Sequence, residues 1–304
     1  MKAMKILLLG KDGQVGWELQ RGLAVLGEVV AVGRQAALNP QGLCGDLTDL
    51  AGLAETLRQV QPQVIVNAAA HTAVDKAESE PDVSRQINAL APVLLAQHAT
   101  ETGALLVHYS TDYVFDGSGH VPWTETDATA PLSVYGQTKL EGEQAVAMCA
   151  KHLIFRTSWV YGARGGNFAK TMLRLAAERE SLSVIDDQFG APTSAELLAD
   201  VTAHALRATL AQHQLAGLYH CVAGGETSWH GYARFVLAQA QGLGWTLKAG
   251  PEQVNATSTA HYPTPAQRPL NSRLDTTKLQ THFGLTLPPW QQGVARMLTD
   301  ITGK

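Results

Sequence analysis

Short, almost continuous apolar runs alternate with helical patterns through the first half of the chain. The runs KILLLG, EVVAVG, VIVNAAA and ALLVHYS begin at residues 5, 28, 64 and 104 and lack the alternation of half-exposed strands. Such runs are typical of parallel strands that are covered on both faces. Between them, segments such as 14–27 and 88–103 carry apolar residues at helical spacing. The pattern predicts right-handed strand–helix–strand units and an α/β fold built on a doubly wound, Rossmann-type parallel sheet.

The pattern continues less regularly in the second half. Segments 152–162 (HLIFRTSWVYG) and 181–188 (SLSVIDDQ) are predicted as further strands. Residues 227–244 have an amphipathic helical pattern, and 249–279 are rich in Pro, Thr and Ser. We expect a first domain over 1–160, completed by a segment near 180–225. A second, smaller C-terminal substrate domain would comprise 225–304 with part of 160–180.

Composition narrows the class of protein. The 304 residues are 45% hydrophobic and 16% charged, and the net charge of −4 argues against nucleic acid or an anionic membrane as partner. The three cysteines form no C-x-x-C pair, which suits a reducing compartment. The apolar run at the start is too short for a signal peptide, and no run approaches the ~18 apolar residues of a membrane span. We therefore expect a cytoplasmic protein.

A glycine-rich turn follows the first predicted strand. Gly10, Gly13 and Gly16 form G-x-x-G-x-x-G between that strand and a helix, with Gln14 and Val15 inside the turn. Gly10 would allow the tight turn, Gly13 would let the backbone approach a pyrophosphate, and Gly16 would let the helix pack closely. This context predicts a dinucleotide site and makes the first domain dinucleotide-binding; an ordinary strand–helix turn is the weaker alternative.

The second strand ends in Gly33 and Arg34. NAD-binding proteins of this type usually have a carboxylate at this place, which accepts a hydrogen bond from the ribose 2′-hydroxyl. A carboxylate repels a 2′-phosphate, whereas a glycine followed by an arginine accommodates one. We therefore expect NADPH to be accepted, with NADH possible as well. A solvated arginine with no role in binding is the alternative.

Tyr135 and Lys139 stand four residues apart at the start of a predicted helix, so that their side chains share one face. A phenol and an ammonium titrate near ~10 and ~10.4, and a fixed cation beside a phenol lowers the pKa of the phenol. The fourth apolar strand ends in Ser110 and Thr111, at the edge of the sheet where ligands bind. The alternative is that Tyr135 and Lys139 are simply an exposed i,i+4 pair on the helix surface.

These motifs together resemble the extended short-chain dehydrogenase/reductase family. That family combines G-x-x-G-x-x-G with Y-x-x-x-K and an upstream Ser or Thr. The segments KDGQVGWEL, NAAAHTAVDKAE, HYSTDYVFDG, VYGQTKLEGE, FRTSWVYG, DDQFGAPT and RPLNSRLDT extend the resemblance over nearly the whole chain, and it is closest to members that reduce a 4-keto sugar nucleotide.

The resemblance implies a reaction and roles for residues. NAD(P)H would deliver hydride to the C4 ketone of a dTDP-4-dehydro sugar, a precursor of cell-surface polysaccharide. Tyr135 would donate the proton, Lys139 would hold the ribose and lower the tyrosine pKa, and Thr111 would orient the carbonyl oxygen. Further cofactor contacts are implied for Asp46, Leu47, Ala68, Ala69, Ala70 and Tyr109, and sugar contacts for Asp112 and Trp159. For Trp159, an aromatic core residue at the end of a strand is an equal alternative.

Some members of this group hold Mg²⁺ at a dimer interface through two glutamates and a serine. Glu18 and Glu196 match the glutamates, whereas Ala260 stands at the serine position. The resemblance thus leaves open a structural Mg²⁺ and a homodimer. Glu18 on an exposed helix without a metal is an equal alternative. Asn88, Arg268 and Arg273 remain weaker candidates, Asn88 as a structural residue and the arginines near a diphosphate.

Three other functions compete with a reductase. A 4,6-dehydratase of this family needs a glutamate after Thr-Asp, whereas Tyr113 follows Asp112 here; an epimerase would keep its cofactor bound. A regulatory subunit of the methionine adenosyltransferase type shares the tyrosine–lysine pair but does no chemistry. Consumption of NADPH in proportion to product would exclude the epimerase and the regulatory subunit.

Overall fold

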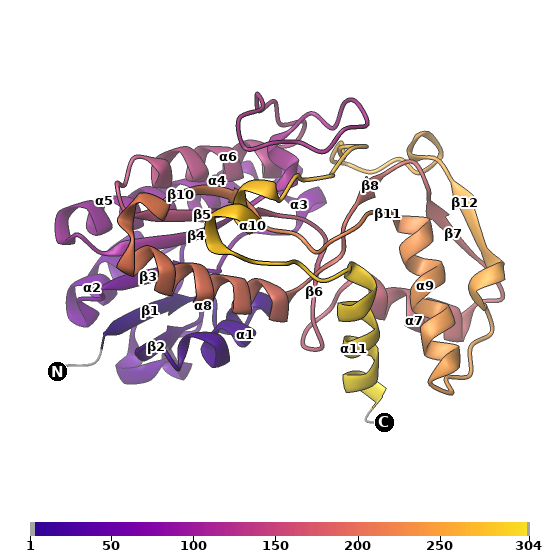
Figure 1. The fold of residues 1–304 in the computed structure, drawn as a ribbon, viewed down its shortest axis with the longest axis horizontal. Helices are drawn as coiled ribbons and strands as arrows, with labels where there is room; N and C mark the ends of the chain where they lie inside the picture. The colour runs from indigo at the N-terminus through magenta and orange to yellow at the C-terminus, as the bar shows by residue number, and fades with distance from the viewer. Residues whose placement is uncertain (1–3, 303–304) are drawn as a thin grey trace.

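The computed structural model describes residues 4–302 and is organised around one six-stranded sheet (Figure 1). Its strand order is β10–β5–β4–β3–β1–β2, and every pair is parallel. The strands are β1 (Lys5–Leu9), β2 (Glu28–Val32), β3 (Val64–Asn67), β4 (Leu105–Thr111), β5 (His152–Thr157) and β10 (Gly217–His220). The order reverses between β1 and β3, and this switch point opens a crevice at the carboxyl ends of the strands. The predicted fold class is confirmed.

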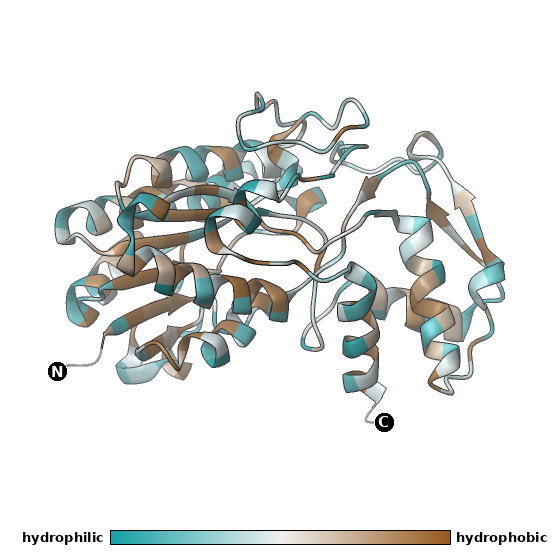
Figure 2. Cartoon of the chain, viewed as in Figure 1, coloured by the Kyte–Doolittle hydropathy of each residue, from teal (hydrophilic) through white to brown (hydrophobic). Residues whose placement is uncertain are grey.

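Helices cover both faces of this sheet. On one face α1 (Gln14–Leu23), α8 (Ala195–Ala211) and α10 (Thr277–Phe283) contribute to a core with the apolar side chains of β1, β3, β4 and β5. On the other face α2 (Leu50–Val60), α5 (Ala91–Thr102) and α6 (Val134–Ala147) do the same. The strands are accordingly apolar on both sides, and much of their length is coloured as hydrophobic in Figure 2. Two short helices, α3 (Val74–Ser79) and α4 (Pro81–Arg85), and a π turn (Gln86–Leu90) precede α5.

A second, smaller unit packs beside the sheet. Its core is formed by α7 (Phe168–Glu178), α9 (Trp229–Gly242) and α11 (Trp290–Thr302), together with β7 (Leu182–Ile185) and β12 (Val254–Thr257). β7 and β12 pair in parallel as a separate two-stranded sheet. Segment 181–188 therefore contains a strand, as predicted, but this strand lies outside the large sheet, and β10 takes the last place there.

Two short ladders connect the units. β6 (Val160–Tyr161) pairs in parallel with β9 (Thr193–Ser194), and β8 (Phe189–Gly190) pairs antiparallel with β11 (Thr227–Ser228). Figure 1 shows β8 and β11 between the large sheet and α9. α10 lies in the range 225–304 expected for the smaller domain, yet Leu279 and Phe283 pack into the core of the large sheet. The chain thus passes between the units several times.

Among residues 4–302, no helix combines the length and the apolar character that crossing a bilayer requires.

Candidate active site

A cavity of about 910 Å³ opens at the carboxyl ends of β1, β3, β4 and β5. It is lined by residues from both units. The predicted residues on its wall are Gly10, Gly13, Gln14, Val15, Gly33, Arg34, Asp46, Leu47, Ala68, Ala69, Ala70, Tyr109, Thr111, Asp112, Tyr135, Lys139 and Trp159. Gly16 lies behind the wall, and Glu18 and Glu196 are not part of the lining.

The glycine turn forms one end of the cavity. Gly10 has φ of +88°, and a Cβ there would lie 2.8 Å from the backbone N of Ala69. A Cβ on Gly16 would lie only 2.0 Å from the carbonyl oxygen of Gly10, so α1 packs against the turn because Gly16 has no side chain. Gly13 caps α1 without a side-chain hydrogen bond, which leaves backbone N–H groups at the helix start available to an anion. The turn therefore fits a dinucleotide pyrophosphate.

The end of β2 forms the neighbouring wall. Asn39 clamps Gly33 on both sides: Gly33 N donates to Asn39 Oδ1 at 2.8 Å, and Asn39 Nδ2 donates to Gly33 O at 2.7 Å. Arg34, which follows, is exposed on the cavity wall. The carboxylate of Asp12 approaches so closely that a Cβ on Gly33 would lie 2.1 Å from its Oδ2, with the Lys11 side chain beside it. This end thus carries two cations and one carboxylate.

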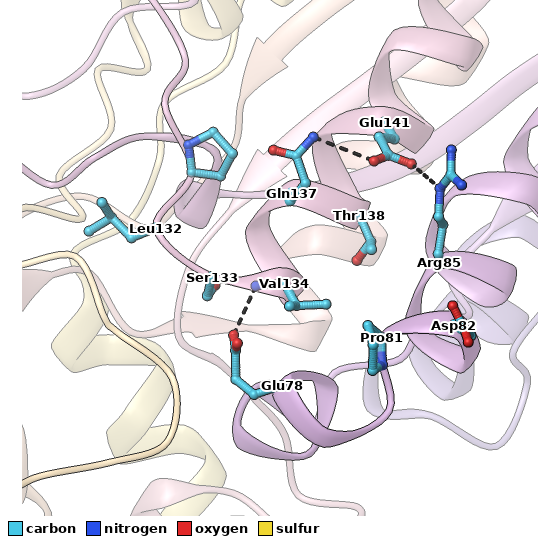
Figure 3. A pocket seen from close by; sticks show the side chains of 11 residues that line it. Glu78, Pro81, Asp82, Arg85, Leu132, Ser133, Val134, Gln137, Thr138 and Glu141 are labelled. Atoms are coloured by element: carbon cyan, nitrogen blue, oxygen red, sulfur yellow. Dashed lines mark hydrogen bonds and ion pairs between the residues drawn. The ribbon is translucent and has the colours of Figure 1, made fainter.

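Tyr135 sits in the first turn of α6, and two side chains fix that turn. Ser133 Oγ accepts a hydrogen bond from Gly136 N at 3.2 Å, an ordinary N-cap. Glu78, reaching across from α3, accepts a hydrogen bond from Val134 N at 2.8 Å. Figure 3 shows this contact beside a surface pocket of about 480 Å³ on the outer side of α6. Hydrogen bonds from Val134 N and Gly136 N, the residues on either side of Tyr135, therefore fix the backbone at this position.

A short hydrogen-bonded network connects Tyr135 with Asp112 through the hydroxyl of Thr111. Thr111 Oγ1 donates to Asp112 Oδ1 at 3.0 Å, and burial raises the pKa of Asp112 to about 6, with hydroxyls of Ser272 and Thr111 partly offsetting the effect. Burial also raises the pKa of Tyr135 to about 12, which the hydrogen bond with Thr111 partly offsets. All three side chains line the cavity.

Lys139 lies one turn after Tyr135 and is buried. Its Nζ donates to the carbonyl oxygen of Tyr109 at 2.5 Å, and burial lowers the pKa of Lys139 to about 8, with Glu143 opposing the shift. The expectation that Lys139 brings the pKa of Tyr135 down is not met in this structure, because burial of the phenol dominates. The ammonium is directed to the backbone of β4, and with a pKa of about 8 it remains mostly protonated at neutral pH.

The raised pKa suits a proton donor. At neutral pH a phenol with a pKa of about 12 is fully protonated. An alkoxide is about as basic as hydroxide, whose conjugate acid, water, has a pKa of ~15.7. Transfer of the proton from the phenol to a newly formed alkoxide is therefore favourable, because the pKa of the phenol is several units lower. Tyr135 can thus act as an acid in the reducing direction without a lowered pKa.

Trp159 and Trp229 close the side of the cavity towards the smaller unit. Their rings stack with centroids 3.7 Å apart and planes inclined by 16°. Trp159 has φ of +49°, in the left-handed region, which costs a non-glycine residue of order 1–3 kcal/mol and is concentrated at functional sites. Trp159 was predicted from the sequence to meet the sugar; Trp229 was not identified.

Three weaker candidates have structural partners. Asn88 is buried and bridges the backbone of His71, accepting from His71 N at 2.8 Å and donating to His71 O at 3.1 Å. Arg268 forms a two-pronged pair with Asp75 at 2.7 and 3.1 Å. Arg273 Nε donates to the carboxylate of Glu226 at 2.6 Å, and its guanidinium lies over the ring of Phe189. None of Asn88, Arg268 and Arg273 lines the cavity.

The residues suggested for Mg²⁺ do not fit a metal well. Glu18 interacts with Arg21 at 3.5 Å, and Glu196 with Arg296 at 3.2 Å. Burial raises the pKa of Glu196, and the nearby charge of Glu18 acts in the same direction. Across residues 4–302, no three His, Cys, Asp or Glu side chains gather as metal ligands.

Other residues of the cavity were missed in the sequence. Asp12 lies on the cavity wall inside the glycine turn, with the side chain of the neighbouring Lys11 close to Gly33, and the spacing of glycines says nothing about the side chains between them. Trp229 starts a helix of the smaller unit, far along the chain from the motifs. Its signal, an aromatic residue directly after a helix-capping serine, is not specific. Within the described residues, the buried hydroxyls of Ser110 and Thr157 have no hydrogen-bond partner and lie on the same wall, where a ligand can satisfy them.

Comparisons with known proteins give the family. A family model described as "RmlD substrate binding domain" matches residues 4–302. A protein of Salmonella typhimurium named dTDP-4-dehydrorhamnose reductase is 59% identical over 299 residues, covering 98% of each chain.

Solved structures agree with the sequence comparison. The crystal structure of a dTDP-4-dehydrorhamnose reductase from Clostridium acetobutylicum has a TM-score of 0.87 at 36% identity, covering 99% of this chain and 100% of that one. The one from Bacillus anthracis, solved in complex with NADP, has a TM-score of 0.85 at 33% identity with the same coverage. The chain therefore belongs to the RmlD family, in which these relatives are named dTDP-4-dehydrorhamnose reductases.

Proposed function

We propose that this protein is an NADPH-dependent reductase that converts dTDP-4-dehydro-β-L-rhamnose to dTDP-β-L-rhamnose. One observation carries the proposal: a glycine turn suited to a pyrophosphate and the Tyr135–Thr111–Asp112 network line the same cavity. The names of relatives that match nearly the whole chain support the choice of substrate. The smaller unit, which contributes Trp229 to the cavity, would bind the sugar nucleotide, and the unit of the large sheet would bind the cofactor.

The residues of the cavity have separate tasks in this reaction. NADPH, when bound, supplies the hydride for C4 of the sugar. When the sugar binds, the Thr111 hydroxyl would turn from Asp112 to donate its one hydrogen bond to the C4 oxygen and so orient the ketone, while Tyr135 gives that oxygen its proton. Lys139, held by the carbonyl of Tyr109, would bind ribose hydroxyls and add positive charge near the developing oxyanion.

Cofactor selection would depend on the cluster at Gly33. Arg34 and Lys11 offer charge to a 2′-phosphate, and Asp12 offers an acceptor to a free 2′-hydroxyl. We propose that NADPH is used and that NADH is accepted as well. The Bacillus anthracis relative crystallised with NADP is consistent with this cofactor.

The direct test is NADPH oxidation by the purified protein with freshly made dTDP-4-dehydro-L-rhamnose, with analysis of the product configuration at C4. We expect one NADPH consumed for each dTDP-L-rhamnose formed. Product formed without net NADPH oxidation would indicate an epimerase. Cofactor binding without oxidation of NADPH would instead favour a regulatory protein.

A further inference from the structure

The stacked tryptophans join the two units at the wall of the cavity. Trp159 follows β5 of the large sheet, whereas Trp229 is the first residue of α9 in the smaller unit. Their ring centroids are 3.7 Å apart and both rings line the cavity. The glycine turn and Arg34 lie on other elements, β1, α1 and the end of β2. A change in the stacked tryptophans would therefore alter the cavity wall next to the smaller unit and leave the wall formed by the glycine turn and Arg34 in place.

Trp229 is held firmly in its place. Its Nε1 donates to Oε1 of the buried Gln188 at 3.1 Å. Gln188 in turn donates from Nε2 to Thr259 Oγ1 at 3.1 Å. At the backbone, Ser228 Oγ caps α9 by accepting from Gly231 N at 3.0 Å. The indole of Trp229 thus has a fixed plane as well as a fixed position.

Trp159, in contrast, depends on its neighbours. Its backbone has φ of +49°, a conformation that surrounding contacts must maintain. A Cβ on Gly190 would lie 3.0 Å from the Trp159 ring, and Gly190 is paired with Thr227, two residues before Trp229. The ring of Trp159 therefore packs against Gly190 and Trp229, and both are set by the β8–β11 ladder.

We propose that Trp229 is a positioning residue for the sugar nucleotide, acting by fixing the Trp159 ring at the cavity wall. This inference rests on the proposed function. A rigid pair of stacked rings presents a flat apolar surface to the ligand at low cost in side-chain entropy. Removal of Trp229 frees the Trp159 ring, so affinity for the sugar nucleotide falls while affinity for the cofactor is kept.

The experiment compares Trp229→Leu and Trp229→Phe with the wild type in the full-length protein. Trp245→Leu is the matched control, because Trp245 also packs against the core of the smaller unit but does not line the cavity. Far-ultraviolet circular dichroism reports the exciton couplet of the stacked indoles. Calorimetric titration gives the Kd for dTDP-L-rhamnose, fluorescence titration gives the Kd for NADPH, and steady-state assays give KM and kcat.

For Trp229→Leu we expect loss of the couplet, and a rise of about tenfold or more in the Kd and KM for the sugar nucleotide. The Kd for NADPH should stay within about twofold of wild type. Trp229→Phe, which keeps an aromatic ring on Trp159, should recover most of the affinity. Trp245→Leu should match the wild type in all four measurements.

Gln188→Met provides a second test should Trp229→Leu fail to fold, since it removes the hydrogen bonds of Gln188 to the indole and to Thr259 and preserves the side-chain volume. It should weaken sugar-nucleotide binding without affecting NADPH. Unchanged affinity for dTDP-L-rhamnose in folded variants, or an equal loss for NADPH, would overturn the inference while leaving the reductase activity of the wild type intact. A wild type that neither binds nor reduces the sugar nucleotide would instead overturn the proposed function and this inference together.

Discussion

Tyr135 is the residue on which the proposed chemistry depends most. Its phenol is buried, hydrogen-bonded to Thr111, and has a pKa raised to about 12, so it carries a proton throughout the neutral range. A weaker acid is a poorer donor, but the alkoxide it meets is a much stronger base. The site therefore achieves proton donation by keeping the phenol protonated and next to the reacting oxygen.

Replacing Tyr135 by phenylalanine removes the proton donor and almost no binding surface. We expect kcat to fall by about 10²- to 10⁴-fold, with the Kd for NADPH nearly unchanged. Steady-state kinetics together with a fluorescence titration of NADPH would measure both. An unaltered kcat would show that the proton comes from another group.

Asp112 gives a prediction that depends on pH. Burial raises its pKa from 3.8 to about 6, so between these values the folded state binds more protons than the unfolded state, and stability falls as the pH rises. Above pH 6 the charged carboxylate should cost about 3 kcal/mol, at 1.36 kcal/mol for each pKa unit. Asp112→Asn, which cannot ionise, should therefore be more stable than wild type at pH 8 and not at pH 4.

Urea unfolding at the two pH values would test this difference. The comparison between pH values within each protein serves as the control, because any loss of packing in the variant is present at both. A gain that is the same at pH 4 and pH 8 would mean that ionisation of Asp112 is not its cause.

At the other end of the cavity, Arg34 provides a test of cofactor choice. Arg34→Ala should raise the KM for NADPH by about tenfold and leave that for NADH nearly unchanged, because only NADPH carries a 2′-phosphate. The ratio of kcat/KM for the two cofactors is the measurement. Equal changes in KM for NADPH and NADH would show that Arg34 does not distinguish the two cofactors. Lys11, whose side chain also lies beside Gly33, would then be the residue to test.

At the scale of elements, the sequence predicts the large sheet well and the smaller unit less well. Buried parallel strands need apolar side chains on both faces, which makes β1, β3 and β4 conspicuous. β10 has only four residues, and β7 reads like a strand of the large sheet because the sequence does not encode which partner it pairs with. Segment 152–162 was expected to be one strand, but the left-handed backbone at Trp159 divides it into β5 and β6.

The candidate site likewise contains features that the sequence predicts and features that it does not. Motifs with fixed local spacing, such as Tyr135 with Lys139, keep their meaning because a helix or turn determines their geometry. Contacts between segments far apart in the chain, such as Trp229 on Trp159 or Asp12 against Gly33, arise only when those segments pack together. No local pattern could reveal them.

The start of α6 is the element on which the position of Tyr135 depends. Glu78→Ala removes the acceptor for Val134 N, whereas Glu78→Gln retains an acceptor oxygen. We expect the alanine variant to lose about 1 kcal/mol of stability, as for a lost helix cap, and to lower kcat several-fold. The glutamine variant should recover both, measured by urea unfolding and steady-state assays. Equal kcat in the two variants and the wild type would show that Ser133 alone positions the turn.

At the scale of the whole molecule, the path of the chain links the two units. The chain leaves the large sheet after β5, forms α7 and β7, returns for α8 and β10, and crosses again to α9. It comes back once more for α10, whose Leu279 and Phe283 belong to the core of the large sheet, and ends in α11. Neither unit is thus a continuous segment that could be removed without breaking the other core.

This arrangement predicts that a ligand of the large unit stabilises the small one. NADPH at 100 times its Kd should add about 2.7 kcal/mol to the free energy of unfolding. Near-ultraviolet circular dichroism includes signals from Trp245 and Trp290 of the smaller unit. Because the chain passes repeatedly between the units, we expect a single unfolding transition, which NADPH shifts as a whole to higher urea concentration. Arg34→Ala at the same NADPH concentration should show a smaller displacement. Two transitions, with only one displaced by NADPH, would show that the units unfold independently and that the stacked tryptophans do not couple them.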